Sequence, residues 1–163
     1  RRAGWTQNQL QHTIQGDMSV GVVTASTSKT IAQAPDRVLA ALADYETVRP
    51  RILPEQYRDY AVVEGGQGSG TVVQWILQAT SKRSRNMKMS VTVEGMQVVE
   101  RDANSSLVTT WTVAPSGSGS EVTVLTEWDG AGGIGGFFEK IFAPRGLNAI
   151  QAQTLTNLEK HVH

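Results

Sequence analysis

The alternation of apolar and polar residues divides the chain into strand-like and helix-like segments. A β-branched run predicts a first strand at residues 22–31. Pro35 and Asp36 follow it, and proline suits the first position of a helix while aspartate suits its positive end. Apolar residues then recur at helical spacing, which predicts an amphipathic helix of about ten residues. Residues 44–52 predict a second short helix, closed by Pro54.

The pattern then changes to a period of two, which predicts six more strands. These lie at residues 57–64, 71–80, 85–94, 96–102, 106–114 and 121–128. Short turns rich in Gly, Ser and Asn separate them, so successive strands must be antiparallel neighbours. Residues 137–162 have the pattern of a long helix, with a kink expected near Pro144. The fold class is therefore α+β: a curved seven-stranded antiparallel sheet with two short helices and a long C-terminal helix across its concave side, enclosing a cavity.

Composition narrows the possible chemistry. The chain has 163 residues, 39% of them hydrophobic, and 15 Lys and Arg balance 15 Asp and Glu, so no nucleic-acid partner is expected. It has no cysteine, and its histidines are His12, His161 and His163, so a histidine triad in the domain body is excluded. We predict no catalytic residue, no metal site and no cofactor. Apolar runs are too short to span a membrane, and we expect a cytoplasmic protein.

The first residues differ in composition from the rest. Residues 1–17 are polar and rich in glutamine, and they precede Met18. Because Met18 could start the native protein, we interpret them as an N-terminal extension or a leftover of cloning, and favour this over a functional arm. No signal peptide is visible, because residues 1–17 lack its apolar core. Residues 18–163 are predicted to form a single ligand-binding domain.

One side of each predicted strand, together with one face of the long helix, supplies the candidate ligand contacts. A solid core is the alternative, but the choice of Met and Trp on this side favours a cavity, because methionine adapts to irregular shapes and tryptophan can orient a polar group. Phe137 and Phe138 could close the cavity as a lid or anchor the start of the helix. The candidates are Val73, Trp75, Leu77, Met87, Met89, Val91, Thr109, Trp111, Val113, Thr126, Trp128, Phe137, Phe138, Leu147, Ile150, Gln151 and Thr154.

Other polar or flexible features allow two interpretations each. Glu127 and Asp129 could form an acid–base pair, but the alternation places Glu127 on the outer face, which favours a solvated pair. Lys29 could point inward, although lysines at strand ends are usually solvated. Residues 130–136 include five glycines and predict a hinge or gate to the cavity, with a passive linker as the alternative. A basic cluster could contact an anionic headgroup or membrane, or be a solvated hairpin tip, which we favour; its members are Lys82, Arg83, Arg85 and Lys88.

Short motifs give a family resemblance. Residues 31–38, with Pro35 and Asp36, and residues 44–54, which end at Pro54, resemble the opening of the START-like (helix-grip) superfamily. The glycine-led strand at residues 70–72 and the order of elements are also similar to its polyketide cyclase/dehydrase and lipid-transport branch. The resemblance covers about residues 20–162 and implies a hydrophobic ligand cavity. It implies no single reaction, because one fold can host many functions.

We therefore expect binding or transport of a hydrophobic small molecule or lipid, in a cavity of about 300–1,000 Å³. The polar groups of Thr109, Thr126, Gln151 and Thr154 are expected to orient it. One alternative is a polyketide cyclase or aromatase-type enzyme that confines a flexible chain. Another is a protein-interaction module with a vestigial pocket. The sequence indicates no oligomeric state.

Overall fold

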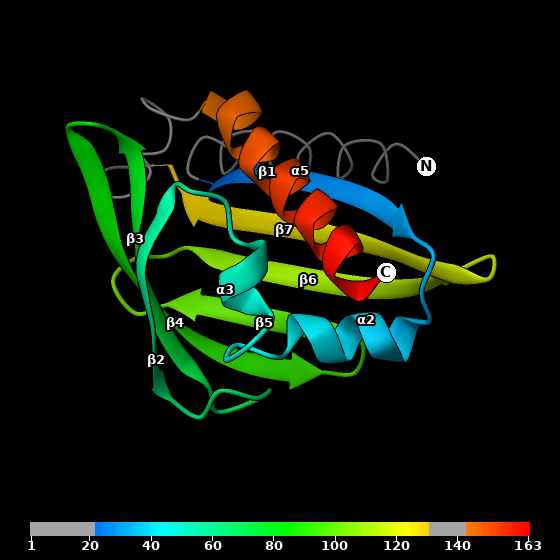
Figure 1. The fold of residues 1–163 in the computed structure, drawn as a ribbon. Helices are drawn as coiled ribbons and strands as arrows, with labels where there is room; N and C mark the ends of the chain where they lie inside the picture. Colours follow the sequence, from blue (N-terminus) through cyan, green and yellow to red (C-terminus); the bar gives the residue numbers. More distant parts are fainter. Residues whose placement is uncertain (1–21, 131–142) are drawn as a thin grey trace, which may run out of the picture.

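The structure, a computed structural model, describes residues 22–130 and 143–163 (Figure 1). Seven strands and three helices are described, and they confirm the predicted helix-grip α+β fold. The predicted extension at residues 1–17 and the lid residues Phe137 and Phe138 lie outside the described residues, as does most of the glycine-rich segment. The elements are β1 (Val22–Ile31), α2 (Pro35–Leu42), α3 (Arg49–Ile52), β2 (Tyr57–Glu64), β3 (Val72–Thr80), β4 (Arg83–Glu94), β5 (Gln97–Asp102), β6 (Val108–Ser116), β7 (Gly119–Asp129) and α5 (Ala143–Val162).

All seven strands belong to one antiparallel sheet with the order β1-β7-β6-β5-β4-β3-β2. Strands β2 to β7 form the predicted six-stranded meander, and β1 joins it beside β7, in a register that runs from Val22 opposite Asp129 to Ile31 opposite Ser120. Gly119 is needed at this end of the sheet, because a Cβ atom there would lie only 2.4 Å from the carbonyl oxygen of Ile31.

The predicted sidedness of the strands is confirmed by their burial. Trp75, Met87 and Trp111 are buried, whereas Gln74 and Asn86, their neighbours in sequence, are exposed. The buried face is covered by α5, which crosses the sheet obliquely, and by α2 and α3 (Figure 1). This arrangement puts the core, and any space inside it, between the sheet and the three helices.

The second short helix is shorter than predicted. It spans four residues, Arg49–Ile52, instead of residues 44–52. The carboxylate of Asp44 accepts hydrogen bonds from the backbone N–H groups of Glu46 (3.1 Å) and Thr47 (2.9 Å), which makes this stretch a turn. Pro50 then lies in the first turn of α3, where its missing N–H has no cost. The kink expected near Pro144 would fall at residues 141–142, outside the described residues.

Candidate functional site

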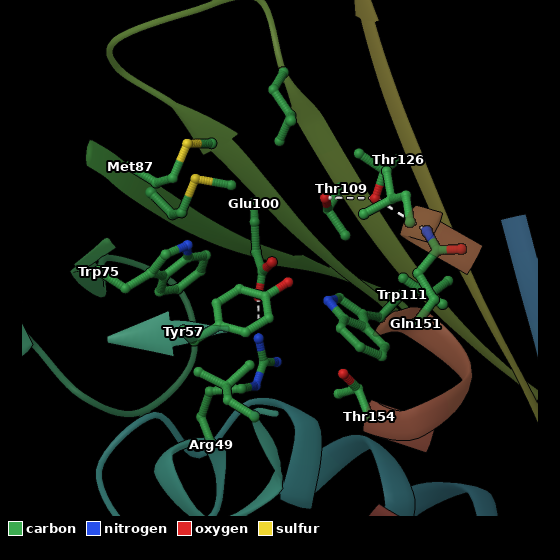
Figure 2. Close-up of a pocket in the computed structure, with 15 residues that line it drawn as sticks. Arg49, Tyr57, Trp75, Met87, Glu100, Thr109, Trp111, Thr126, Gln151 and Thr154 are labelled. Carbon is green, nitrogen blue, oxygen red and sulfur yellow. Dashed lines mark hydrogen bonds and ion pairs between the residues drawn. The ribbon is translucent and has the colours of Figure 1, made fainter. Parts of the chain in front are cut away.

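A cavity lies between the buried face of the sheet, α3 and α5 (Figure 2). Apolar side chains of its wall come mainly from β3, β4, β6, β7 and α5. Polar side chains come from α3, β2, β5, β6, β7 and α5. The apolar residues are Leu53, Trp75, Met87, Met89, Leu107, Trp111, Val124 and Leu147. The polar residues are Arg49, Tyr57, Glu100, Thr109, Thr126, Gln151 and Thr154.

The cavity is smaller than predicted. The described side chains leave a cavity of about 50 Å³. One water needs about 10–15 Å³ of such a volume, so the cavity has room for a few waters and is far smaller than the predicted 300–1,000 Å³. Large side chains on the wall occupy the difference: the guanidinium of Arg49, the indoles of Trp75 and Trp111, and the thioether chain of Met87.

A buried ion pair joins α3 to the sheet at one wall of the cavity. Arg49 on α3 is 1% exposed and Glu100 on β5 is 3% exposed. The Nη1 of Arg49 and the hydroxyl of Tyr45 both donate to Oε2 of Glu100, and the Nη2 of Arg49 donates to the carbonyl of Leu42 at 2.7 Å. The guanidinium carbon also lies 4.3 Å from the ring centre of Tyr45 and 5.1 Å from that of Trp111.

The surroundings of these groups fix their protonation. Burial by itself would lower the pKa of Arg49, but the negative charge of Glu100 outweighs burial and holds that pKa above its ordinary value. Burial raises the pKa of Tyr45 well above its ordinary value, and burial together with the charge of Glu100 raises the pKa of Tyr57. The site therefore contains a charged arginine and protonated phenols at neutral pH.

The four polar residues predicted to orient a ligand are paired with each other or with backbone. The hydroxyls of Thr109 and Thr126 are 2.9 Å apart, and the Nε2 of Gln151 donates to the hydroxyl of Thr126 (3.2 Å) and to the carbonyl of Ala25 (3.1 Å). The hydroxyl of Thr154 donates to the carbonyl four residues earlier in α5, at 2.9 Å. These hydrogen bonds connect α5 to β1 and β7.

Two nitrogen donors on the cavity wall differ from this network. The Nε1 of Trp111 and the Nε of Arg49 are buried and have no hydrogen-bond partner among the residues that the structure describes. Buried polar atoms usually have a partner, so each exception requires an explanation. Both donors belong to side chains that line the cavity, and a bound molecule is one such explanation.

The structure brings nine of the predicted site residues together around the cavity. These are Trp75, Met87, Met89, Thr109, Trp111, Thr126, Leu147, Gln151 and Thr154. Six others are buried on the same side of the sheet or on α5 but do not line the cavity, because helices and neighbouring side chains cover them. These are Val73, Leu77, Val91, Val113, Trp128 and Ile150.

Sequence reasoning missed the charged part of the site. Arg49 follows a polar turn, and Glu100 interrupts the apolar run of β5, so neither matched the period-two pattern used for the candidates. One signal could have found Glu100: it is directly opposite Thr109 in the β5–β6 pair, and residues directly opposite each other share a face. Leu53, Tyr57, Leu107 and Val124 were also not among the candidates.

The remaining sequence candidates lie away from the cavity. Lys29 is partly exposed and forms an ion pair with Glu159 at 3.4 Å. Glu127, Asp129 and the basic residues of the β3–β4 hairpin are on the surface, as in the solvated interpretation. Within residues 22–130 and 143–163, no three or more His, Asp or Glu gather closely enough to hold a metal ion. No helix in these ranges is long and apolar enough to cross a membrane.

Comparisons with known proteins agree with this architecture. The KanY protein, solved by NMR, is 57% identical, with a TM-score of 0.80 over 87% of this chain and 98% of that chain. The ZhuI aromatase/cyclase from Streptomyces sp. R1128 is 12% identical, with a TM-score of 0.67 over 86% of this chain and 93% of that one. Norcoclaurine synthase from Thalictrum flavum is 16% identical, with a TM-score of 0.65 over 86% of each chain. No curated protein matches.

The two enzymes are too distant in sequence to indicate more than a shared fold. The family model described as polyketide cyclase/dehydrase and lipid transport, in contrast, matches residues 22–163, which include every described element. Together with the seven-stranded sheet and the long helix across it, this match shows that the chain belongs to the polyketide cyclase/dehydrase and lipid-transport family.

Proposed function

We propose that the protein binds a hydrophobic small molecule or lipid in the cavity between the sheet and α5, and carries it without changing it. The observation that supports this most is a pair of buried donors on the cavity wall, Trp111 Nε1 and Arg49 Nε, that have no hydrogen-bond partner among the described residues. A core built only for stability leaves few such atoms, because each costs free energy. In a binding site, such donors can remain without a protein partner because a bound ligand accepts their hydrogen bonds.

The small volume requires the wall to move when a ligand enters. Met87 and Met89 lie side by side on the wall and are 3% and 1% exposed. Methionine has three rotatable side-chain bonds and repacks easily, so these two side chains can yield space at low cost. Each Å² of apolar surface that the ligand and the wall remove from water then contributes roughly 25 cal/mol of favourable binding free energy.

A cyclase-type enzyme is the second candidate, and the charged pair favours it. Arg49 and Glu100 line a cavity with Tyr57, and such groups can move protons or polarise a carbonyl when a flexible chain is held beside them. A carrier and an enzyme differ in one measurable respect. A carrier releases the molecule that it bound, whereas an enzyme releases a product.

The test is displacement of a neutral fluorescent dye, 1-aminoanthracene, by long-chain lipids and polycyclic compounds. We expect dye binding at micromolar concentration, and loss of most of it in Met87→Trp, which fills the cavity. Met96→Trp is the matched control, because Met96 is 37% exposed and lies at a turn. Overpacking costs typically 1–3 kcal/mol, so thermal unfolding monitored by circular dichroism must show that both variants are folded.

Failure of the dye to bind, or equal binding by Met87→Trp and Met96→Trp, would refute the proposal. Native mass spectrometry of protein purified from its own host complements the test, because a retained ligand gives its mass directly. Incubation with poly-β-ketone mimics decides between the two candidates: product above the buffer background would establish the enzyme and exclude a simple carrier.

A further inference from the structure

We infer that the ligand carries a neutral hydrogen-bond-accepting oxygen, such as a ketone carbonyl, on an apolar ring or chain, and that Trp111 and Tyr57 hold this oxygen. The inference rests on the proposed function, because it specifies the ligand of the same cavity. It assigns specificity to Trp111, whose buried Nε1 has no partner among the described residues, and to Tyr57, which lines the same cavity.

Trp111 is the stronger of the two indications. Its side chain is 5% exposed, it lines the cavity from β6, and its Nε1 has no partner among the described residues. An indole nitrogen can only donate, so only an acceptor can satisfy it. The guanidinium of Arg49, 5.1 Å from the indole, packs against the ring and limits its reorientation.

Tyr57 approaches the same space from the start of β2. Its ring packs edge-on against Trp75 at 5.4 Å, and within the described chain its hydroxyl makes no hydrogen bond. Figure 2 shows Tyr57 and Trp111 on either side of the middle of the site, with the indole nitrogen on the side that faces Tyr57. Because burial raises the pKa of Tyr57, its hydroxyl remains a donor at neutral pH.

The charges of the wall decide between a neutral acceptor and an anion. Among the described residues that line the cavity, Arg49 carries the positive charge, and Glu100 already accepts its hydrogen bond and neutralises that charge. A ligand carboxylate would bring a second negative charge beside the buried Glu100, where no described lining residue offers a free positive charge to balance it. A neutral carbonyl uses the same donors without this cost.

The experiment compares three compounds that share the fluorene ring system and differ at C9: fluorene, 9-fluorenone and fluorene-9-carboxylate. The affinity of each compound is measured by its displacement of 1-aminoanthracene. The proteins compared are the unmodified protein and the variants Trp111→Phe, Tyr57→Phe and Trp128→Phe. We expect 9-fluorenone to bind about tenfold more tightly than fluorene, as one good hydrogen bond gives, and the carboxylate to bind most weakly. Trp111→Phe should lower the ratio of 9-fluorenone affinity to fluorene affinity by about tenfold, whatever it does to fluorene itself, and Tyr57→Phe should lower the same ratio.

Trp128→Phe is the matched control. Trp128 is buried on β7 and does not line the cavity, so its replacement should keep the preference for 9-fluorenone. Equal binding of fluorene and 9-fluorenone, tightest binding of the carboxylate, or a preference that survives both Trp111→Phe and Tyr57→Phe would overturn this inference alone. Absence of binding by the dye and all three compounds would overturn the proposed function and, with it, this inference.

Discussion

At the scale of single residues, Arg49 and Glu100 have an energetic role that is separate from any ligand. Both are almost fully buried, and moving two charges out of water is costly even when they pair. The ion pair as a whole therefore adds little to the free energy of unfolding. Removing one partner alone, however, leaves the other charge buried without its counter-ion. Tyr45 also depends on it, because its hydroxyl donates to the same carboxylate oxygen.

A double-mutant cycle measures this dependence. Glu100→Gln leaves a buried charge on Arg49 without its counter-ion, and we expect the free energy of unfolding to fall by about 3–5 kcal/mol. Arg49→Met should cost a similar amount. The double variant should lose less than the two losses added together, because neither charge of the pair then remains buried without its partner. Urea unfolding gives the values, and losses that simply add would contradict the coupling.

Residue-scale prediction from sequence succeeded where alternation was regular. Trp75, Met87 and Trp111 lie in strands with a strict period of two, so their burial followed from the pattern. Glu100 lies in β5, where Val98, Val99 and Glu100 are all buried in succession, and no period identifies which of them faces the cavity. Pairing with the next strand supplies that information, and pairing is a property of the fold.

At the scale of elements, Asp44 connects two loops that are distant in sequence. Its carboxylate accepts from the backbone of Glu46 and Thr47 and, at 2.9 Å, from the side chain of Gln67 in the loop after β2. Backbone hydrogen bonds from Tyr45 to Gly66 (2.8 Å) and from Gly68 to Ala43 (2.9 Å) join the same two loops. The start of α3, and so the position of Arg49, depends on this junction.

Replacing Asp44 by alanine should lower the free energy of unfolding by about 1 kcal/mol at pH 7, as loss of a helix cap does. Burial alone would raise the pKa of Asp44, but hydrogen bonds from Thr47, Gln67 and Glu46 outweigh it and lower that pKa. The stabilisation is thus present above pH 4 and is lost as the pH falls through the lowered value. Denaturation from pH 7 to pH 2 should show the variant and parent converging.

Asp44→Asn is the control for this prediction, because its amide oxygen can still accept backbone hydrogen bonds. It should lie between the parent and Asp44→Ala at pH 7. A gap between Asp44→Ala and the parent that stays constant down to pH 2 would show that the carboxylate charge plays no part.

At the scale of the whole molecule, all three tyrosines of the chain have a raised pKa. Burial is the largest cause for each of Tyr45, Tyr57 and Tyr60. The folded protein therefore keeps phenolic protons that the unfolded chain releases above about pH 10. Because the unfolded state then binds fewer protons than the folded state, stability falls as the pH rises above 10.

We therefore expect tyrosinate absorbance to appear together with unfolding in an alkaline titration, and not as a separate step near pH 10. Absorbance at 295 nm follows the tyrosinate, and far-ultraviolet circular dichroism follows the sheet. The two curves should coincide. A full tyrosinate signal with an intact sheet would mean that the phenols are accessible to solvent in the folded protein.

The whole-molecule fold could be predicted because the signals for it are repeated many times. Six segments of period two with short turns allow one meander, and one long amphipathic helix has one sheet face to cover. The cavity volume could not be predicted, since it is the difference between the large space enclosed by the backbone and the side chains that fill it. Side-chain conformations such as that of Met87 on the cavity wall set this difference, and the period-two pattern carries no information about them.

The pairing of β1 with β7 and α5 has a consequence for when the site comes into existence. Gln151 bonds to the carbonyl of Ala25, 126 residues earlier, and Thr27 donates to the same glutamine. Contacts this far apart in sequence form late, because a long loop must close before they stabilise anything. During synthesis on a ribosome, the hydrogen bonds between β1 and α5 therefore cannot form until α5 has been made. Until α5 emerges, only α2 and α3 can cover the buried face of the sheet, so the nascent chain exposes part of the apolar surface that later lines the cavity.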